Sequence, residues 1–411
     1  IAGVVMRSLG LAAGSAMAAN VYGGGATLPA GAYVGFNFLS ASGIQKMSNN
    51  TGAGQSGAGI SNTSIFGAWA AANSSALGYC QTGSGNGKKI FDHYNGTTTL
   101  AGAVGTCDGT INSGSGFGAP TGVAVDPHFA GSDAPMSTAE FGWFNNGGKA
   151  ATYGQPVQFP AIAGSVAIVY NNGDLTSQLA LTRAQVCGVF SGTITDWKTL
   201  DASLPSKAIK VAYRQDGSGT TFSMANYLAT ACPGTAASHF IVDQAFSTVV
   251  SKIAPSLSSG PVFGNGNPDL VDKVSTNDGA IGYAEAANLK AAQAVGLDSN
   301  VAYATVEGFD PYANFPGSIN LTGTVSDQAV GTPDPTTGKV VLAALSPSVA
   351  GCMFVTNPNN YALAAGRYPI MAVSYLIPHN QGNGTDVTPV RGPLASAHSR
   401  AACPVLPPGP A

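Results

Sequence analysis

The chain has 411 residues, of which 44% are hydrophobic and only 9% are charged, and its formal net charge at pH 7 is −3. Average soluble proteins carry about 25% charged residues, so the surface of this one must be built largely from uncharged polar groups. The length allows two domains of ordinary size. The low charge, with no basic cluster among aromatic residues, excludes a typical nucleic-acid-binding protein.

The N-terminal segment is typical of a secretory signal peptide. Arg7 precedes a short run of small and apolar residues, and Ala16-Met17-Ala18 matches an A-x-A cleavage site. We therefore interpret residues 1–18 as the remnant of a signal peptide and expect a periplasmic or secreted protein. No later stretch has 18 uninterrupted apolar residues, so the sequence predicts no transmembrane segment.

Two glycine-rich turns each precede a candidate helix start: residues 23–29 read GGGATLP and residues 81–88 read QTGSGNGK. Glycine lets an anion approach the backbone, and the free N–H groups of a helix's first turn attract negative charge. The second turn misses the G-x-G-x-x-G dinucleotide fingerprint, and Lys89 stands where a P-loop needs Ser or Thr. Either turn alone is also typical of an ordinary helix cap.

An acidic segment, GSDAPMS, occupies residues 131–137. Its Asp133 is a candidate ligand group, and the alternative is that Ser132 and Asp133 only cap a helix. Apolar runs at residues 122–125, 165–170, 209–213 and 370–377 predict strands, and residues 220–231 and 239–252 predict helices between them. This alternation favours an α/β fold. Residues 310–340, rich in Pro, Gly, Asp and Thr, look like an insertion.

The most informative segment is residues 212–222, AYRQDGSGTTF. It sets Arg214 and Asp216 beside a Gly-Ser-Gly-Thr turn that opens the helix predicted at residues 220–231. A guanidinium group is permanently charged and forked, which suits a tetrahedral oxyanion. Together with the earlier turns, this segment indicates that several backbone loops converge on one anionic ligand.

Six cysteines, an even number, suit an oxidising compartment. Six cysteines allow fifteen pairings; pairing by sequence proximity predicts disulfides Cys80–Cys107, Cys187–Cys232 and Cys352–Cys403. The chain has no C-x-x-C and no H-E-x-x-H motif, and its five histidines are scattered, so we expect no metal site and no cofactor.

In these segments the chain resembles the phosphate-binding proteins of bacterial ABC phosphate transporters, and especially their secreted DING-type relatives. The SDAP and DGSGTTF segments are the specific parts of a resemblance that spans most of residues 22–380. It implies that inorganic phosphate is the ligand and that an ABC permease in the inner membrane is a possible partner. The implied phosphate contacts are Thr27, the Leu28 backbone, Ser84, Asp133, Arg214, Ser218, Gly219 and Thr220, with Asp216 orienting Arg214.

Asp133 has a chemical reason to be in such a site. A carboxylate facing an anion is repulsive unless the ligand brings a proton to share. Phosphate keeps a proton near neutral pH whereas sulfate keeps none, so a buried Asp133 would favour phosphate and penalise sulfate.

The resemblance also implies a two-lobed periplasmic-binding-protein architecture of type 2, with the ligand in a cleft between the lobes. We expect residues 19–162 together with 305–411 to form lobe one, residues 163–304 to form lobe two, and the protein to be a monomer. The alternatives are a phosphate-ester hydrolase using the same cleft, or a surface adhesion or assembly protein. The chain lacks a G-x-S-x-G motif and a serine with an identifiable base, which favours a binding protein over an enzyme.

Overall fold

The computed structural model describes residues 20–37, 46–48, 59–72, 75–94, 96–99, 127–253, 257, 260–315, 323–346, 352–363 and 365–380. The predicted signal-peptide remnant at residues 1–18 and the strand predicted at residues 122–125 lie outside these ranges. Cys107 and Cys403 also lie outside them.

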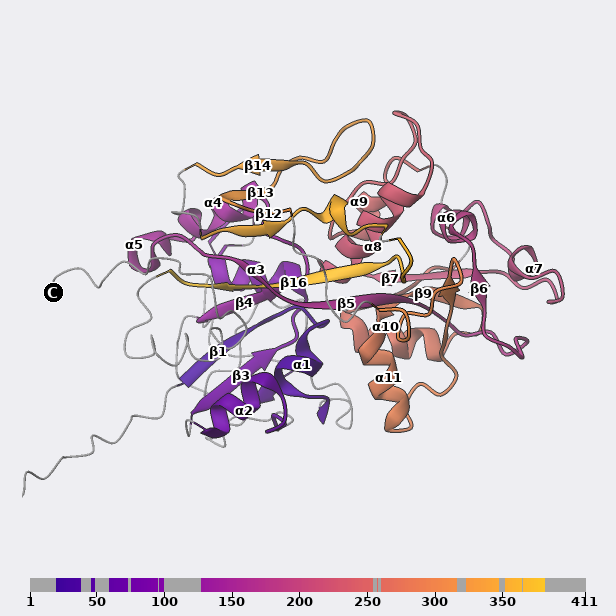
Figure 1. The fold of residues 1–411 in the computed structure, drawn as a ribbon, viewed down its shortest axis with the longest axis horizontal. Helices are drawn as coiled ribbons and strands as arrows, with labels where there is room; N and C mark the ends of the chain where they lie inside the picture. Colours follow the sequence, from indigo (N-terminus) through magenta and orange to yellow (C-terminus); the bar gives the residue numbers. More distant parts are fainter. Residues whose placement is uncertain are drawn as a thin grey trace, which may run out of the picture.

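One large mixed sheet organises the described residues (Figure 1), with strand order β2-β3-β1-β4-β16-β5-β9-β7-β8 and with β10 paired to β5. These strands are β1 Asn20–Gly25, β2 Lys46–Ser48, β3 Ala76–Cys80, β4 Phe129–Ser132, β5 Phe159–Tyr170, β7 Lys210–Arg214, β8 Val262–Gly264, β9 Ala280–Glu285, β10 Ala302–Tyr303 and β16 Met371–Pro378. We call β2, β3, β1 and β4 the first half-sheet, and β9, β7 and β8 the second half-sheet.

Parallel pairing dominates both half-sheets. Strand β1 lies between β3 and β4 and is parallel to both, while β7 lies between β8 and β9 and is parallel to both. The long strands β5 and β16 run antiparallel to each other and join the two half-sheets. Parallel strands point their carboxyl ends to one edge, which is where ligands bind in open α/β sheets.

Helices cover both faces of this sheet. In Figure 1, α3, α4 and α8 lie on the opposite side of strands β16 and β5 from α10 and α11. The helices are α1 Ala30–Val34, α2 Ile65–Ala72, α3 Ser84–Asp92, α4 Thr138–Asn146, α5 Ala150–Tyr153, α6 Arg183–Ser191, α7 Trp197–Leu200, α8 Gly219–Ala231, α9 Phe246–Val249, α10 Gly266–Ser275 and α11 Ala286–Ala294, and a 3-10 turn spans Pro358–Asn360. This arrangement confirms the predicted α/β class.

Small two-stranded ladders complete the fold. They pair β6 Ala180–Leu181 with β11 Thr305–Val306, β12 Thr324–Ser326 with β15 Phe354–Thr356, and β13 Gln328–Val330 with β14 Leu342–Ala344. The described part of the segment read as an insertion therefore contains strands. Ala329 and Val330 of that segment are buried in two different hydrophobic clusters, so it packs as part of the core.

The predicted strands at residues 165–170, 209–213 and 370–377 are confirmed: the first is part of β5, and the other two are β7 and β16 with their bounds shifted by one residue. These strands are largely buried, as expected for strands covered on both faces. The helix predicted at residues 239–252 is wrong, since only α9 forms there. Phe240 and Val242, two residues apart, are both buried in the core, and the Val242 N–H donates to the Gly338 carbonyl. This spacing is typical of extended backbone, in which every second side chain points to the same face.

The predicted Cys187–Cys232 disulfide is present and ties the end of α8 to α6. Cys80 and Cys352 are also disulfide-bonded. The other two predicted pairings each involve a cysteine outside the described residues, so both stay predictions.

Candidate functional site

The candidate site lies where loops from the two half-sheets meet. Thr27 and Leu28 follow β1, Ser84 opens α3 after β3, and Asp133 follows β4. Arg214 ends β7, and the next residues turn into α8. Each of these loops leaves the carboxyl end of a parallel strand, which explains why segments far apart in sequence come together.

Arg214 is the centre of this cluster, with only 2% of its surface exposed. Its Nε donates to Asp216 Oδ1 at 2.6 Å, and its Nη2 donates to Asp216 Oδ2. Asp216 also accepts from the Gly266 N–H at 3.2 Å. This two-pronged ion pair fixes the plane of the guanidinium group.

The remaining Arg214 nitrogen, Nη1, makes longer contacts. It lies 3.5 Å from Thr27 Oγ1, 3.5 Å from Thr220 Oγ1 and 3.3 Å from Asn267 Oδ1. Hydrogen bonds of this length are weak. Arg214 therefore keeps donor capacity directed at hydroxyls from both half-sheets.

The first turn of α8 lies directly against the first half-sheet. Ser218 caps the helix, because its Oγ accepts from the Thr221 N–H at 3.1 Å. A Cβ on Gly219 would lie 2.5 Å from Asp133 Cβ and 2.5 Å from Ser84 Oγ. Only a glycine at position 219 lets the α8 backbone come this close to Asp133 and Ser84, because any side chain would clash with them.

Asp133 is buried beside that turn. Its backbone N–H donates to Ser84 Oγ at 3.0 Å, and its carboxylate Oδ1 has no hydrogen-bond partner within the described residues. Burial raises the pKa of Asp133 to about 7, although the hydroxyl of Ser374 and the charge of Arg214 act in the opposite direction. Asp133 does not cap a helix, since α4 begins five residues later with Ser137 as its cap.

Thr27 connects the two half-sheets. Its Oγ1 accepts from the Asn267 N–H at 3.2 Å, and its carbonyl accepts from Asn288 Nδ2 at 3.5 Å. Leu28 is buried and packs into the largest hydrophobic cluster, so only its backbone is free to serve a polar ligand. The structure thus gathers every residue of the predicted set in one buried cluster.

Asn267 is a site residue that the sequence reasoning missed. It lies in the first turn of α10, and its Oδ1 accepts from both Arg214 and the Glu285 N–H, while its Nδ2 has no partner within the described residues. The segment GNGN at residues 264–267 is a fourth glycine-rich turn before a helix. The same signal that identified the other turns would have found it.

Chemically, the cluster offers a guanidinium group, hydroxyls and helix-start amides, with one carboxyl able to exchange a proton near neutral pH. Such a set suits an oxyanion that carries a proton. Within the described residues, no group of three or more His, Cys, Asp or Glu side chains is placed to hold a metal ion. No helix in that part of the chain is long and apolar enough to cross a membrane.

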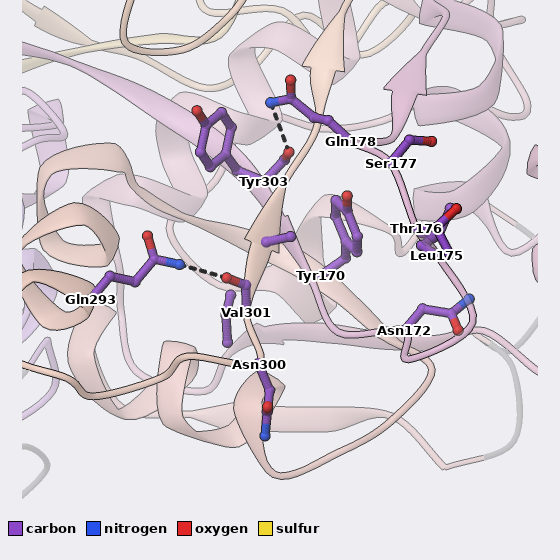
Figure 2. A pocket seen from close by; sticks show the side chains of 11 residues that line it. Tyr170, Asn172, Leu175, Thr176, Ser177, Gln178, Gln293, Asn300, Val301 and Tyr303 are labelled. Atoms are coloured by element: carbon purple, nitrogen blue, oxygen red, sulfur yellow. Dashed lines mark hydrogen bonds between the residues drawn. The ribbon is translucent and has the colours of Figure 1, made fainter.

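A separate pocket of about 470 Å³ lies beside β5 and β10 (Figure 2) and contains none of the predicted site residues. Uncharged side chains line it, including Tyr170, Asn172, Gln293 and Tyr303. Gln293 Nε2 donates to the Val301 carbonyl at its edge. Because it offers no charged donor, this pocket is a poor match for an anion.

Comparison with known proteins places the fold and site in a family. The PBP superfamily domain matches residues 70–397, and the chain belongs to this superfamily. A crystal structure of a phosphate-binding protein from Stenotrophomonas maltophilia is similar with a TM-score of 0.59 at 25% identity, covering 92% of this chain and 84% of that chain. The fold is therefore the type 2 periplasmic-binding-protein architecture that the resemblance implies.

Other relatives carry two kinds of name. PfluDING, a high-affinity periplasmic phosphate-binding protein solved with phosphate, has a TM-score of 0.56 at 25% identity over 92% of this chain and 85% of its own. Alkaline phosphatase L of Pseudomonas aeruginosa PAO1 is 30% identical over 244 residues, which is 59% of this chain and 56% of that protein. Phosphate-binding protein PstS of Pasteurella multocida is 37% identical over 28% of this chain and 33% of its own length. These sequence matches thus span about half of one relative and a third of the other.

Proposed function

We propose that this protein binds inorganic phosphate at the cluster formed by Arg214, Asp133 and the first turn of α8. The observation that carries the proposal is the buried Arg214, oriented by Asp216, whose Nη1 faces the hydroxyls of Thr27 and Thr220 beside the first turn of α8. The contacts would be Thr27, the Leu28 backbone, Ser84, Asp133, Arg214, Ser218, Gly219 and Thr220.

The biological setting belongs to the same proposal. The protein captures phosphate outside the cytoplasmic membrane, in the periplasm or after secretion, and either delivers it to an ABC permease or scavenges it. The names of the S. maltophilia, PfluDING and PstS relatives support this role. Residues 19–162 with 305–411 would act as one lobe and residues 163–304 as the other, in a monomer that needs no cofactor.

Titration calorimetry of phosphate-stripped protein tests this function. We expect one-to-one binding of phosphate near neutral pH and a negligible response to sulfate, because the ionised Asp133 can accept a hydrogen bond only from an anion that carries a proton. Equal affinity for both anions would contradict the role of Asp133. No binding of either would contradict the proposed function.

Hydrolysis of phosphate esters is the second candidate, and the name of the P. aeruginosa relative favours it. The cluster offers mainly fixed donors, whereas a hydrolase needs a nucleophile or an activated water. Incubation with p-nitrophenyl phosphate, before and after addition of divalent metal ions, separates the two candidates. Turnover that is lost in Arg214→Ala would assign the same cluster to an enzyme.

A further inference from the structure

A second polar cluster lies behind the proposed phosphate site, around a buried lysine. Lys88, in α3, has no exposed surface, and its Nζ lies 2.9 Å from both carboxylate oxygens of Glu140 in α4. The same ammonium group lies 3.3 Å from the Ala134 carbonyl. Burial opposes the ionisation of Glu140, but the charge of Lys88 and the hydrogen bonds from Lys88, Ser137 and Gln244 together outweigh it and hold the pKa of Glu140 below its ordinary value.

Gln244 connects this ion pair, which belongs to helices beside the first half-sheet, to the start of α8, which follows strand β7 of the second half-sheet. We call the parts of the chain around the two half-sheets the two halves of the molecule. It lies just before α9, and its Nε2 donates to Glu140 Oε1 at 3.1 Å. Its backbone carbonyl accepts from the Ser218 N–H, at the cap of α8, at 3.0 Å. The segments that carry Glu140 and Gln244 pack in different hydrophobic clusters. Phe141, next to Glu140, belongs to one cluster, and Phe246, two residues after Gln244, belongs to another.

We propose that Glu140 and Gln244 form a latch that holds the two halves of the molecule together around bound phosphate. The latch rests on the proposed phosphate function and adds to it a pair of positioning residues that do not touch the ligand. Gln244 makes both contacts: its backbone carbonyl accepts from Ser218 at the α8 cap, and its side-chain amide donates to Glu140 in the first half. Loss of that amide would free α8 from the ion pair without altering any proposed phosphate contact.

The ion pair explains why this hydrogen bond can have a large effect. A hydrogen bond to a charged acceptor is stronger than one between neutral groups, and the buried carboxylate cannot turn to water for a replacement. Lys88 and the Ser137 N–H, which donates to Glu140 Oε2 at 2.8 Å, hold that carboxylate in place. The acceptor is therefore fixed before the two halves meet.

The test is the rate of phosphate release from Gln244→Met, which keeps the side-chain length and removes the donor. We expect dissociation to be about tenfold faster, with little change in the association rate, because a latch acts only after the halves have met. The matched control is Gln293→Met, whose amide donates to Val301 within one half; its release rate should match that of the parent.

A double variant keeps the proposal falsifiable. In a Lys88→Met/Glu140→Met background, the buried pair is replaced by apolar side chains of similar length, which proteins often tolerate. Adding Gln244→Met to this background should change the release rate no further. If the parent binds phosphate but Gln244→Met releases it at the parental rate, the latch is overturned. If the parent does not bind phosphate, the proposed function fails instead.

Discussion

At the scale of single residues, Arg214 should dominate phosphate affinity. Arg214→Lys retains a positive charge but loses the fork that pairs with Asp216. We expect phosphate binding to weaken by about 2–5 kcal/mol, since the Asp216 charge is then left buried and poorly paired. Calorimetry measures the loss, and circular dichroism checks that the variant is folded. An affinity equal to that of the parent would place the ligand elsewhere.

Asp133 should set the choice between anions. Asp133→Asn replaces the carboxyl by an amide that can donate to a fully ionised oxyanion. The phosphate-to-sulfate affinity ratio should fall by about 5-fold to 150-fold, which corresponds to about 1–3 kcal/mol. Competition of sulfate with labelled phosphate measures this ratio, and an unchanged ratio would remove Asp133 from the discrimination.

At the scale of elements, the first turn of α8 must lie close to the first half-sheet. Gly219→Ala would bring a Cβ to 2.5 Å from Asp133 Cβ, so we expect phosphate affinity to fall by about 5-fold to 150-fold, or about 1–3 kcal/mol. Gly142→Ala in α4 is the matched control, because nothing lies within 4 Å of its added Cβ. If both variants bind phosphate equally well, the close approach has no functional role.

The Cys187–Cys232 disulfide should stabilise the packing of α6 and α8. The bonded residues are separated by 45 positions. Replacing both by Ala should lower the free energy of unfolding by about 2–4 kcal/mol, because the unfolded chain gains freedom. Urea denaturation under oxidising conditions measures the difference, and unchanged stability would contradict the expectation.

The elements differ in how far the sequence predicts them. Strands β5, β7 and β16 follow from apolar runs, and α8 follows from a long segment without Gly or Pro. The helix prediction for residues 239–252 was wrong because Phe240 and Val242 are buried two residues apart, as in an extended strand. Contacts with distant parts of the chain, such as Gly338, fix this conformation. Asn267 was missed although its GNGN turn carried the same signal. The Glu140–Gln244 contact joins residues 104 positions apart, and no local pattern indicates such a pair.

At the scale of the whole molecule, buried carboxyl groups should make stability depend on pH. Burial raises the pKa of Asp133 and of Glu285 to about 7. Between about pH 4 and pH 7 these groups hold protons when folded and lose them when unfolded, so stability should fall as the pH rises through this window. Urea denaturation of phosphate-free protein at pH 5, 6 and 7 measures the trend. Asp133→Asn should make the trend less steep, with Glu285 accounting for the remainder, and stability that rises over the window would contradict the assignment.

The place of β16 in the sheet has a consequence for biosynthesis. Among the strands of the described residues it comes last in sequence, yet it lies between β4 and β5, where it links the two half-sheets. Until residues 371–378 have been made, β4 and β5 have no partner on those edges. Folding therefore cannot finish until nearly all of the chain has been made, which would keep the polypeptide unfolded for the export that we propose.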